Sequence, residues 1–205
     1  MMQVRMSVKG RRQEYKDLTR AALLAAAREQ FADPGFAATT IDDIAAAARV
    51  SKGAVYYHFN DKAELFEAVF REGQQQLLAN VTKAAQRRRD PWEQLDAALA
   101  AYLRGTVSDP THRALLQEAP RALGPDRCRQ IDEQLALPVI HAALKALQDT
   151  GQLAHPPTDI LGRVLFSALC EAAMTAGADP NPNAAQRQAT AALRAITAGL
   201  RKRPP

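Results

Sequence analysis

The side chains best suited to chemistry lie in one short stretch of the chain, residues 51–58. Lys52 carries an ammonium group that can reach guanine O6 and N7 or a phosphate oxygen. Gly53 and Ala54 are small enough to allow close approach of a ligand. Ser51 can cap a helix here, and the other outward positions of that helix hold Tyr56, Tyr57 and His58. This outer surface could meet a nucleic acid.

Two short helices must position these side chains. Thr40, with Asp43 three residues later, is a capping-box variant. It predicts a first helix whose apolar residues repeat on one face: Ile41, Ile44, Ala45 and Ala48. Residues 49–50 form a turn, and the second helix buries Val55 and Phe59. This is a helix-turn-helix, whose second helix enters the major groove by its N-terminal end.

Residues 19–70 carry several motifs in a fixed order: a phenylalanine, a glycine, the capped helix, Ser-Lys-Gly and Tyr-Tyr-His-Phe. This run resembles the N-terminal domain of TetR-family transcriptional regulators. It covers about a quarter of the chain, and residues 71–205 match the family only in length and helical character. The resemblance implies that Tyr56 touches base edges or a thymine methyl, and that Tyr57 and His58 contact phosphates.

Two more residues stand at the starts of helices, where backbone amides and the helix dipole favour phosphate: Thr40 and Lys62. Capping alone is an alternative for Thr40, and core packing alone is an alternative for Tyr56. Arg49 stands where the family often has glycine, so a left-handed conformation there would cost roughly 1 kcal/mol. The predicted DNA-binding residues are Thr40, Ser51, Lys52, Gly53, Ala54, Tyr56, Tyr57, His58 and Lys62.

Composition agrees with an intracellular nucleic-acid-binding protein. The chain has 205 residues, is 47% hydrophobic and carries a net charge of +5. It shows no signal-peptide pattern and no apolar run of the roughly 20 residues that span a bilayer, so we expect a soluble, cytoplasmic protein. Cys128 and Cys170 lack metal-ligand spacing, which favours buried thiols over a disulfide or metal site. We therefore expect no metal or cofactor.

The hydrophobic pattern is helical throughout and predicts an all-α fold with three regions. Residues 1–15 form a flexible basic arm, 16–62 a three-helix DNA-binding domain, and 63–205 a helical domain for effector binding and dimerisation. The arm could follow DNA phosphates or could equally be a solubilising tail. Beyond the head, helices are expected from Asp61 to about residue 88 and then at 91–103, 111–118, 126–150, 158–177 and 183–202.

The helix over residues 160–176 is apolar on nearly every side and must be buried. One side could pack in its own domain and the other on a second subunit, together with the last helix. A homodimer suits a DNA-binding protein because symmetric half-sites need a symmetric protein. A single monomeric core is the alternative.

An effector pocket is expected in the C-terminal domain. That domain has few aromatic residues, so a mainly aliphatic pocket for a small, apolar, not strongly cationic ligand is favoured. The candidate ligand-binding residues are Trp92, Leu95, Leu99, Tyr102, His112, Leu115, Val139, His141, Leu165, Phe166, Leu169 and Glu171. Core packing is the alternative for each aliphatic member.

An enzyme is the rival class, but no catalytic motif supports it: the chain has no HExxH, phosphate loop, nucleophile elbow or dinucleotide fingerprint. We expect a non-enzymatic, homodimeric transcriptional repressor that a small molecule releases from a palindromic double-stranded DNA operator. A constitutive DNA-binding regulator without an effector is the second interpretation.

Overall fold

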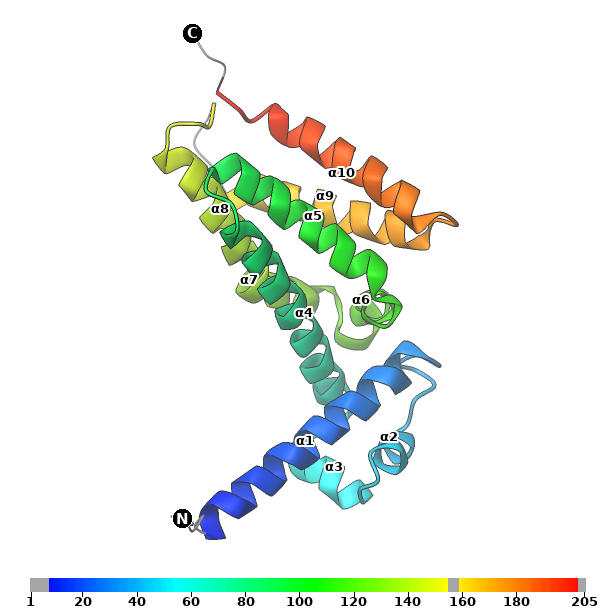
Figure 1. Ribbon diagram of the computed structural model, residues 1–205. Helices are drawn as coiled ribbons and strands as arrows, with labels where there is room; N and C mark the ends of the chain where they lie inside the picture. Colours follow the sequence, from blue (N-terminus) through cyan, green and yellow to red (C-terminus); the bar gives the residue numbers. More distant parts are fainter. Residues whose placement is uncertain (1–7, 155–158, 203–205) are drawn as a thin grey trace, which may run out of the picture. The chain divides into compact units, whose positions relative to one another are not determined.

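The computed structural model describes residues 8–154 and 159–202, and these form ten α-helices (Figure 1). The helices are α1 (Val8–Ala32), α2 (Ile41–Ala47), α3 (Lys52–His58), α4 (Lys62–Gln86), α5 (Pro91–Ser108), α6 (Pro110–Leu123), α7 (Pro125–Leu135), α8 (Leu137–Asp149), α9 (Asp159–Ala178) and α10 (Pro182–Ala198). The all-α expectation is confirmed. The chain divides into two compact units, Met1–Phe70 with Ala114–Leu123, and Arg71–Arg113 with Gly124–Pro205.

The first unit is a small helical head built around aromatic side chains. The rings of Phe31, Phe36 and Phe66 pack against one another in tilted and edge-to-face arrangements, with centroids 5.2 to 5.6 Å apart. Ile44 from α2 and Val55 from α3 are fully buried in the same unit. Burying each large apolar side chain contributes roughly 1.5–3 kcal/mol to stability. This contribution holds α2 and α3 in place, because helices this short are not stable alone.

Local sequence signals set the boundaries of these helices as predicted. The Thr40 hydroxyl accepts the amide of Asp43 at 3.1 Å while the Asp43 carboxylate accepts the amide of Thr40 at 2.9 Å, which is a reciprocal capping box. The Ser51 hydroxyl accepts the amide of Ala54 to begin α3. Arg49 lies between α2 and α3 with φ of 56°, in the left-handed region where glycine would be less strained.

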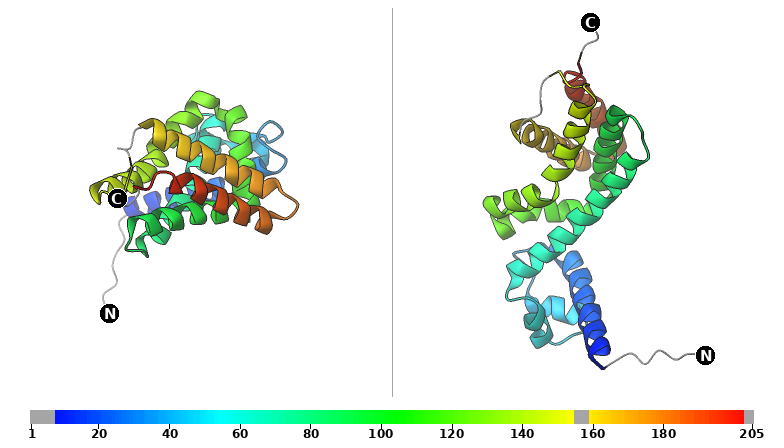
Figure 2. Two further views of the ribbon diagram at one scale, coloured as in Figure 1. Left: turned by 90° about the horizontal axis from the view of Figure 1, so that it is seen from above. Right: turned by 90° about the vertical axis from the view of Figure 1, so that its left-hand side faces the viewer.

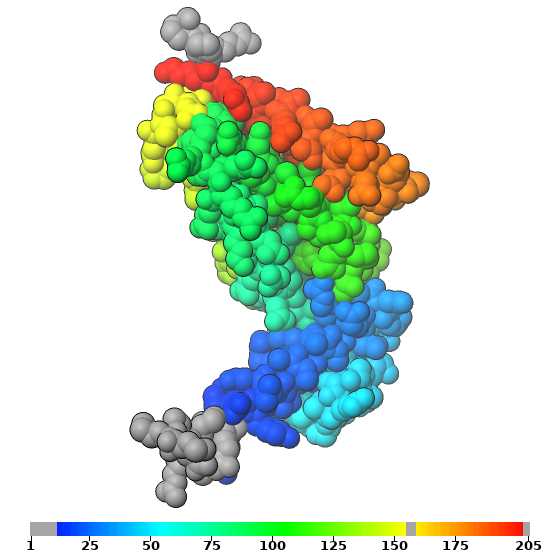
Figure 3. Space-filling view, viewed as in Figure 1, coloured from blue at the N-terminus to red at the C-terminus, as the bar shows by residue number. Residues whose placement is uncertain are grey.

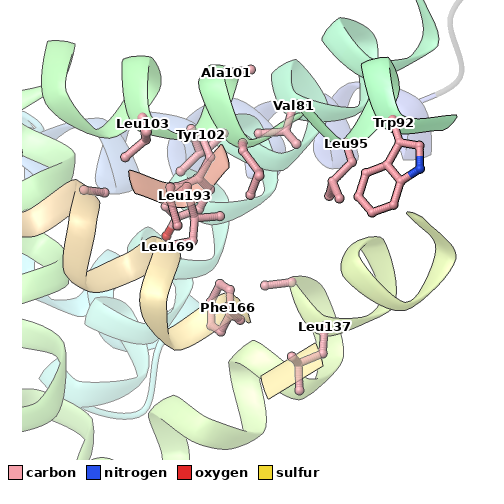
Figure 4. Close-up of a cluster of buried hydrophobic side chains, with 14 of the residues drawn as sticks. Val81, Trp92, Leu95, Ala101, Tyr102, Leu103, Leu137, Phe166, Leu169 and Leu193 are labelled. Atoms are coloured by element: carbon pink, nitrogen blue, oxygen red, sulfur yellow. The ribbon is translucent and has the colours of Figure 1, made fainter. Parts of the chain in front are cut away.

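In the second unit α9 packs against α5, α8 and α10, and α5 also packs against α8 and α10 (Figure 2). Seen from above, α9 and α10 lie side by side, and α10 runs along the surface of its unit (Figure 3). The core is aliphatic with a few aromatic rings (Figure 4). Gly105 of α5 allows close packing, because a Cβ there would collide with Leu77 of α4.

The structure differs from expectation in two helices. Residues 8–15, expected in a flexible arm, continue α1, while residues 1–7 of the expected arm lie outside the described residues. The single helix expected over 126–150 is two helices, α7 and α8, separated at Ala136. Pro138 explains this break, because proline lacks an amide hydrogen and fits the first turn of a new helix.

By length and composition, helix α9 is long and apolar enough to cross a membrane. However, 39% of its apolar 18-residue stretch is buried within its own unit. It packs against α5, α8 and α10, as a core helix of a soluble protein does. Its burial is incomplete, however. Ile160 is 73% exposed and Val164 is 56% exposed, so one apolar side of α9 faces outward.

Candidate nucleic-acid interface and effector cavity

The outer face of α3 carries the predicted DNA-binding side chains. Lys52, Gly53, Tyr56 and Tyr57 are exposed, whereas Val55 is fully buried on the opposite face. Tyr56 is half exposed, so core packing alone does not account for it. The helix therefore presents a cation, a glycine and two phenol groups outward, which are suited to contacting base edges and phosphates.

Lys52 has a partner that the sequence did not indicate. Its Nζ donates to the Asp42 carboxylate at 2.8 Å, and this hydrogen bond, followed by the charge of Asp42, raises the pKa of Lys52. Both side chains are largely exposed, so the ion pair contributes little to stability. Asp42 thus orients the ammonium at the start of α3 and would have to release it for a contact with DNA.

Thr40 acts as a cap in this structure. Its hydroxyl donates to the Asp43 carboxylate at 2.6 Å, and this hydrogen bond is the largest cause of the lowered pKa of Asp43. These capping contacts account for a threonine at position 40 without any contact to DNA. A phosphate contact by Thr40 stays a prediction.

Lys62 is placed differently from the free phosphate-binding cation that the sequence suggested. Its Nζ donates to the carbonyl oxygens of Phe36 and Thr39, each at 2.8 Å, and lies 4.5 Å from the Phe36 ring centroid. The side chain is half-buried. Lys62 therefore stabilises the turn that precedes α2. These two hydrogen bonds use two of the three donors of its ammonium group, and a phosphate contact by Lys62 stays a prediction.

Glu118 of α6 holds the same turn from the other side. Its Oε2 accepts the amide of Phe36 at 3.2 Å, and its Oε1 lies 3.4 Å from the guanidinium of Arg121. Gly35 stands beside it with φ of 100°, a conformation that favours glycine. Glu118 could not be predicted as a partner of the head, since 82 residues separate it from Phe36.

Cations of α1 lie beside the C-terminal end of α3. Lys16 Nζ lies 5.2 Å from the Tyr57 ring centroid, and the guanidinium of Arg20 lies 5.4 Å from that of Phe59. Partial burial, followed by the charges of Lys16 and Arg20, lowers the pKa of His58. A neutral His58 can still donate one hydrogen bond to a phosphate, so that role stays a prediction.

The second unit contains an apolar cavity of about 440 Å³ between α4, α5, α8 and α9. Six of the twelve candidate ligand-binding residues line it: Leu95, Leu99, Tyr102, Val139, Phe166 and Leu169. No charged side chain occurs among the described residues of the lining; its polar members are Thr82, Gln86, Gln94 and Tyr102. Such a cavity suits an uncharged, largely apolar ligand.

The other six candidates lie outside this lining. Trp92, His112 and Leu165 are buried elsewhere, and the Trp92 ring stacks on Arg201 at 4.6 Å. His141 packs on Gly162 and lies 3.9 Å from Asp159. Leu115 belongs to the first unit, and Glu171 is exposed and accepts a hydrogen bond from Thr175.

Much of the lining was not among the predicted residues and comes from the end of α4 and from α8. These lining residues are Leu78, Val81, Thr82, Ala85, Pro138, Ile140, Ala142, Ala143 and Ala146. Amphipathic patterning alone could not separate these residues from ordinary core.

The Tyr102 hydroxyl lies 3.4 Å from Cys170 Sγ, and burial raises the pKa values of both groups, that of Cys170 to about 12. Cys170 is therefore a protonated thiol of low reactivity.

Comparisons with known proteins match both halves of the chain. Residues 23–69 match the model "Bacterial regulatory proteins, tetR family", and residues 92–200 match "Tetracyclin repressor-like, C-terminal domain". The probable acrEF/envCD operon repressor of Escherichia coli K12 is 36% identical over 125 residues, which is 60% of this chain and 54% of that protein. The chain thus spans about half the length of that relative.

Three further similarities extend over most of the chain. The transposon Tn10 TetC protein of Escherichia coli is 26% identical over 78% of this chain and 81% of its own. A crystal structure of a regulator from Pectobacterium atrosepticum has a TM-score of 0.76 at 29% identity, covering 94% of this chain and 98% of that one. A SmeT–triclosan complex has a TM-score of 0.73 at 26% identity, covering 90% and 92%.

Proposed function

Because the chain belongs to the TetR family of bacterial regulatory proteins, we propose that it is a repressor that binds a palindromic operator as a homodimer and leaves it when an apolar ligand binds. The observation that carries this proposal is the pairing of an exposed α3 with a separate, uncharged cavity. One unit can contact DNA while the other holds an effector. We place this activity in the cytoplasm, where the DNA is.

In the proposed complex the N-terminal end of α3 enters the major groove. Lys52 exchanges Asp42 for a guanine edge or a phosphate, and Tyr56 meets a base edge or a thymine methyl. A Cβ at position 53 would make only an ordinary 3.8 Å contact with the hydroxyl of the cap Ser51, so packing does not demand glycine there, and the small size of Gly53 leaves room for DNA. Tyr57 and His58 supply phosphate contacts that fix the orientation of the helix.

A second copy of the chain covers the outward side of α9 and α10. Ile160 and Val164 of α9 and Ile196 of α10, the last 51% exposed, form an apolar surface together with the exposed alanines of α10. Apolar side chains exposed together commonly mark an interface. Two such pairs of helices related by a two-fold axis would make a four-helix contact. Sedimentation of the wild type and of Val164→Glu should show a dimer and a weakened dimer, respectively.

The effector is a neutral, largely apolar molecule. The cavity volume of about 440 Å³ lies within the range of small-molecule sites, and its uncharged lining would leave any buried ligand charge unpaired. The Tyr102 hydroxyl and the amides of Gln86 and Gln94 can orient one or two polar groups. The similar SmeT protein is seen in a complex with triclosan.

Two helices can carry the effect of the ligand to the head, because each belongs to both units. Helix α4 begins with Lys62 in the first unit and continues into the second, whereas α6 begins in the second unit and continues into the first, where it carries Glu118. Both residues hold the Phe36 turn that precedes α2. A shift of either helix would displace that turn and with it the helix-turn-helix. We expect a coupling of about 1–3 kcal/mol.

Calorimetric titration of uncharged aromatic compounds, with and without operator DNA, tests this mechanism. A releasing ligand should bind about 5- to 150-fold more weakly to the DNA complex than to the free protein, by reciprocity. Ala143→Phe, which adds bulk to the lining, should abolish ligand binding and leave operator binding unchanged. A ligand that fills the cavity yet binds equally in both cases would support the constitutive interpretation. Chemical turnover of the ligand would indicate an enzyme.

A further inference from the structure

Helix α1 carries cations on the face that elsewhere buries the core. Leu23, Ala27 and Phe31 of its second half are fully buried. Residues separated by 7 or 11 positions share a face of an α-helix, because 3.6 residues make one turn. The positions that precede these buried residues by 7 or 11 are Arg12, Lys16, Arg20 and the buried Leu24, so the three nearest the N-terminus are cations. We call these three residues the α1 basic face.

The contacts of the α1 basic face place it beside the recognition helix. Lys16 lies over the Tyr57 ring and Arg20 over the Phe59 ring, so two successive turns of α1 flank the C-terminal end of α3. Arg12 lies one further turn toward the N-terminus, about 6 Å along the helix axis. The continuous helix from Val8 therefore extends a row of cations past α3 rather than leaving them on a flexible arm.

The cations of this face are open to solvent. Arg12, Lys16 and Arg20 are all exposed, and Tyr57 is 69% exposed beneath Lys16. The nearby Asp17 carboxylate accepts the Gln13 amide at 2.9 Å. A helix that served only to close the core would not need three cations in line beyond the buried stripe. Cations in a row beside a DNA-contacting helix are what neutralisation of backbone phosphates requires.

We propose that the α1 basic face binds backbone phosphates of the DNA flanking the bases contacted by α3, with Tyr57 positioning Lys16 for this contact. The inference rests on the proposed DNA-binding function and adds α1 to its contact surface. These contacts carry no sequence information, so they should raise affinity equally for the operator and for other DNA.

The test measures the salt dependence of binding. Arg12→Gln and Lys16→Gln each remove one cation, and Lys83→Gln, an exposed lysine near the end of α4, removes the same charge elsewhere. Each phosphate contact contributes about 0.9 to the slope of log affinity against log salt, or about 1.8 in a dimer. Between 50 and 200 mM salt the wild type should therefore lose about 12-fold more affinity than Arg12→Gln or Lys16→Gln. Lys83→Gln should follow the wild type.

The preference for operator over scrambled DNA should be the same in the wild type, Arg12→Gln and Lys16→Gln. The proposal would be overturned if both variants are folded by circular dichroism and yet show the same salt slope as the wild type. A wild type without sequence preference would refute the operator function but not this inference, which the slopes still decide.

The positioning role of Tyr57 has a separate readout. Tyr57→Phe keeps the ring beneath Lys16, whereas Tyr57→Ala removes it. Lys16→Gln should reduce the slope of log affinity against log salt by the same amount in a Tyr57→Phe background as in the wild type. In a Tyr57→Ala background the reduction should be smaller. Equal loss in both backgrounds would show that the ring does not position the lysine.

Discussion

Replacing Lys62 by methionine should destabilise the head rather than only weaken DNA binding. The change keeps the aliphatic stem and removes the ammonium that serves the carbonyl oxygens of Phe36 and Thr39. A hydrogen bond to a charged group contributes about 1.5–3 kcal/mol when shielded, and the contact with the Phe36 ring adds about 0.5–1 kcal/mol. Because Lys62 is only half-buried, we reduce the sum and expect a loss of about 2–3 kcal/mol.

Differential scanning calorimetry of the full chain measures this loss. Lys52→Met is the matched control, because its ammonium pairs with the exposed Asp42 and the substitution should leave the melting temperature nearly unchanged. Operator binding is then measured at low temperature, where both variants are folded. If Lys62→Met melts like the wild type while the salt dependence of its DNA binding falls by one contact per head, Lys62 is a phosphate ligand and the structural role argued above is wrong.

Three further predictions concern other residues. Arg49→Gly should stabilise the head by about 1 kcal/mol, because φ of 56° strains any residue with a Cβ; thermal melting that shows a loss would contradict this. Lys52→Ala and Tyr56→Ala should each cost roughly 1–3 kcal/mol in binding and blur the preference at particular base pairs, as competition with single-substituted operators would show. Burial raises the pKa of Asp132 to about 6, so the native state holds a proton that the unfolded chain has released, and stability should fall as pH rises from about 4 to 6. Partial solvent access limits that fall to about 1–2 kcal/mol, and urea denaturation of Asp132→Asn should not show it.

The head could be predicted in detail because its signals are local. The Thr40 and Asp43 capping box, the Ser51 cap and the buried Val55 act within a few residues of one another. Such contacts are encoded in the spacing of residue types. The left-handed conformation of Arg49 agrees with the resemblance, because the family often has glycine at this position of the turn.

Contacts between distant parts of the chain could not be predicted in the same way. The roles of Lys62 and Glu118 depend on carbonyl and amide groups 26 and 82 residues away along the chain. Half of the predicted pocket residues lie outside the cavity, since an apolar residue on a helix fits a core and a cavity lining equally well. The break between α7 and α8 was missed although Pro138 marks it.

The most direct test of the central claim is selection of bound duplexes from a random-sequence DNA library by this chain. An inverted repeat should be enriched, with half-site centres about one helical turn, ~34 Å, or a multiple of it apart. The same selection with Lys52→Ala should lose the preference at symmetric positions of both half-sites. Enrichment of a single asymmetric half-site bound by a monomer, or no enrichment at all, would contradict the account.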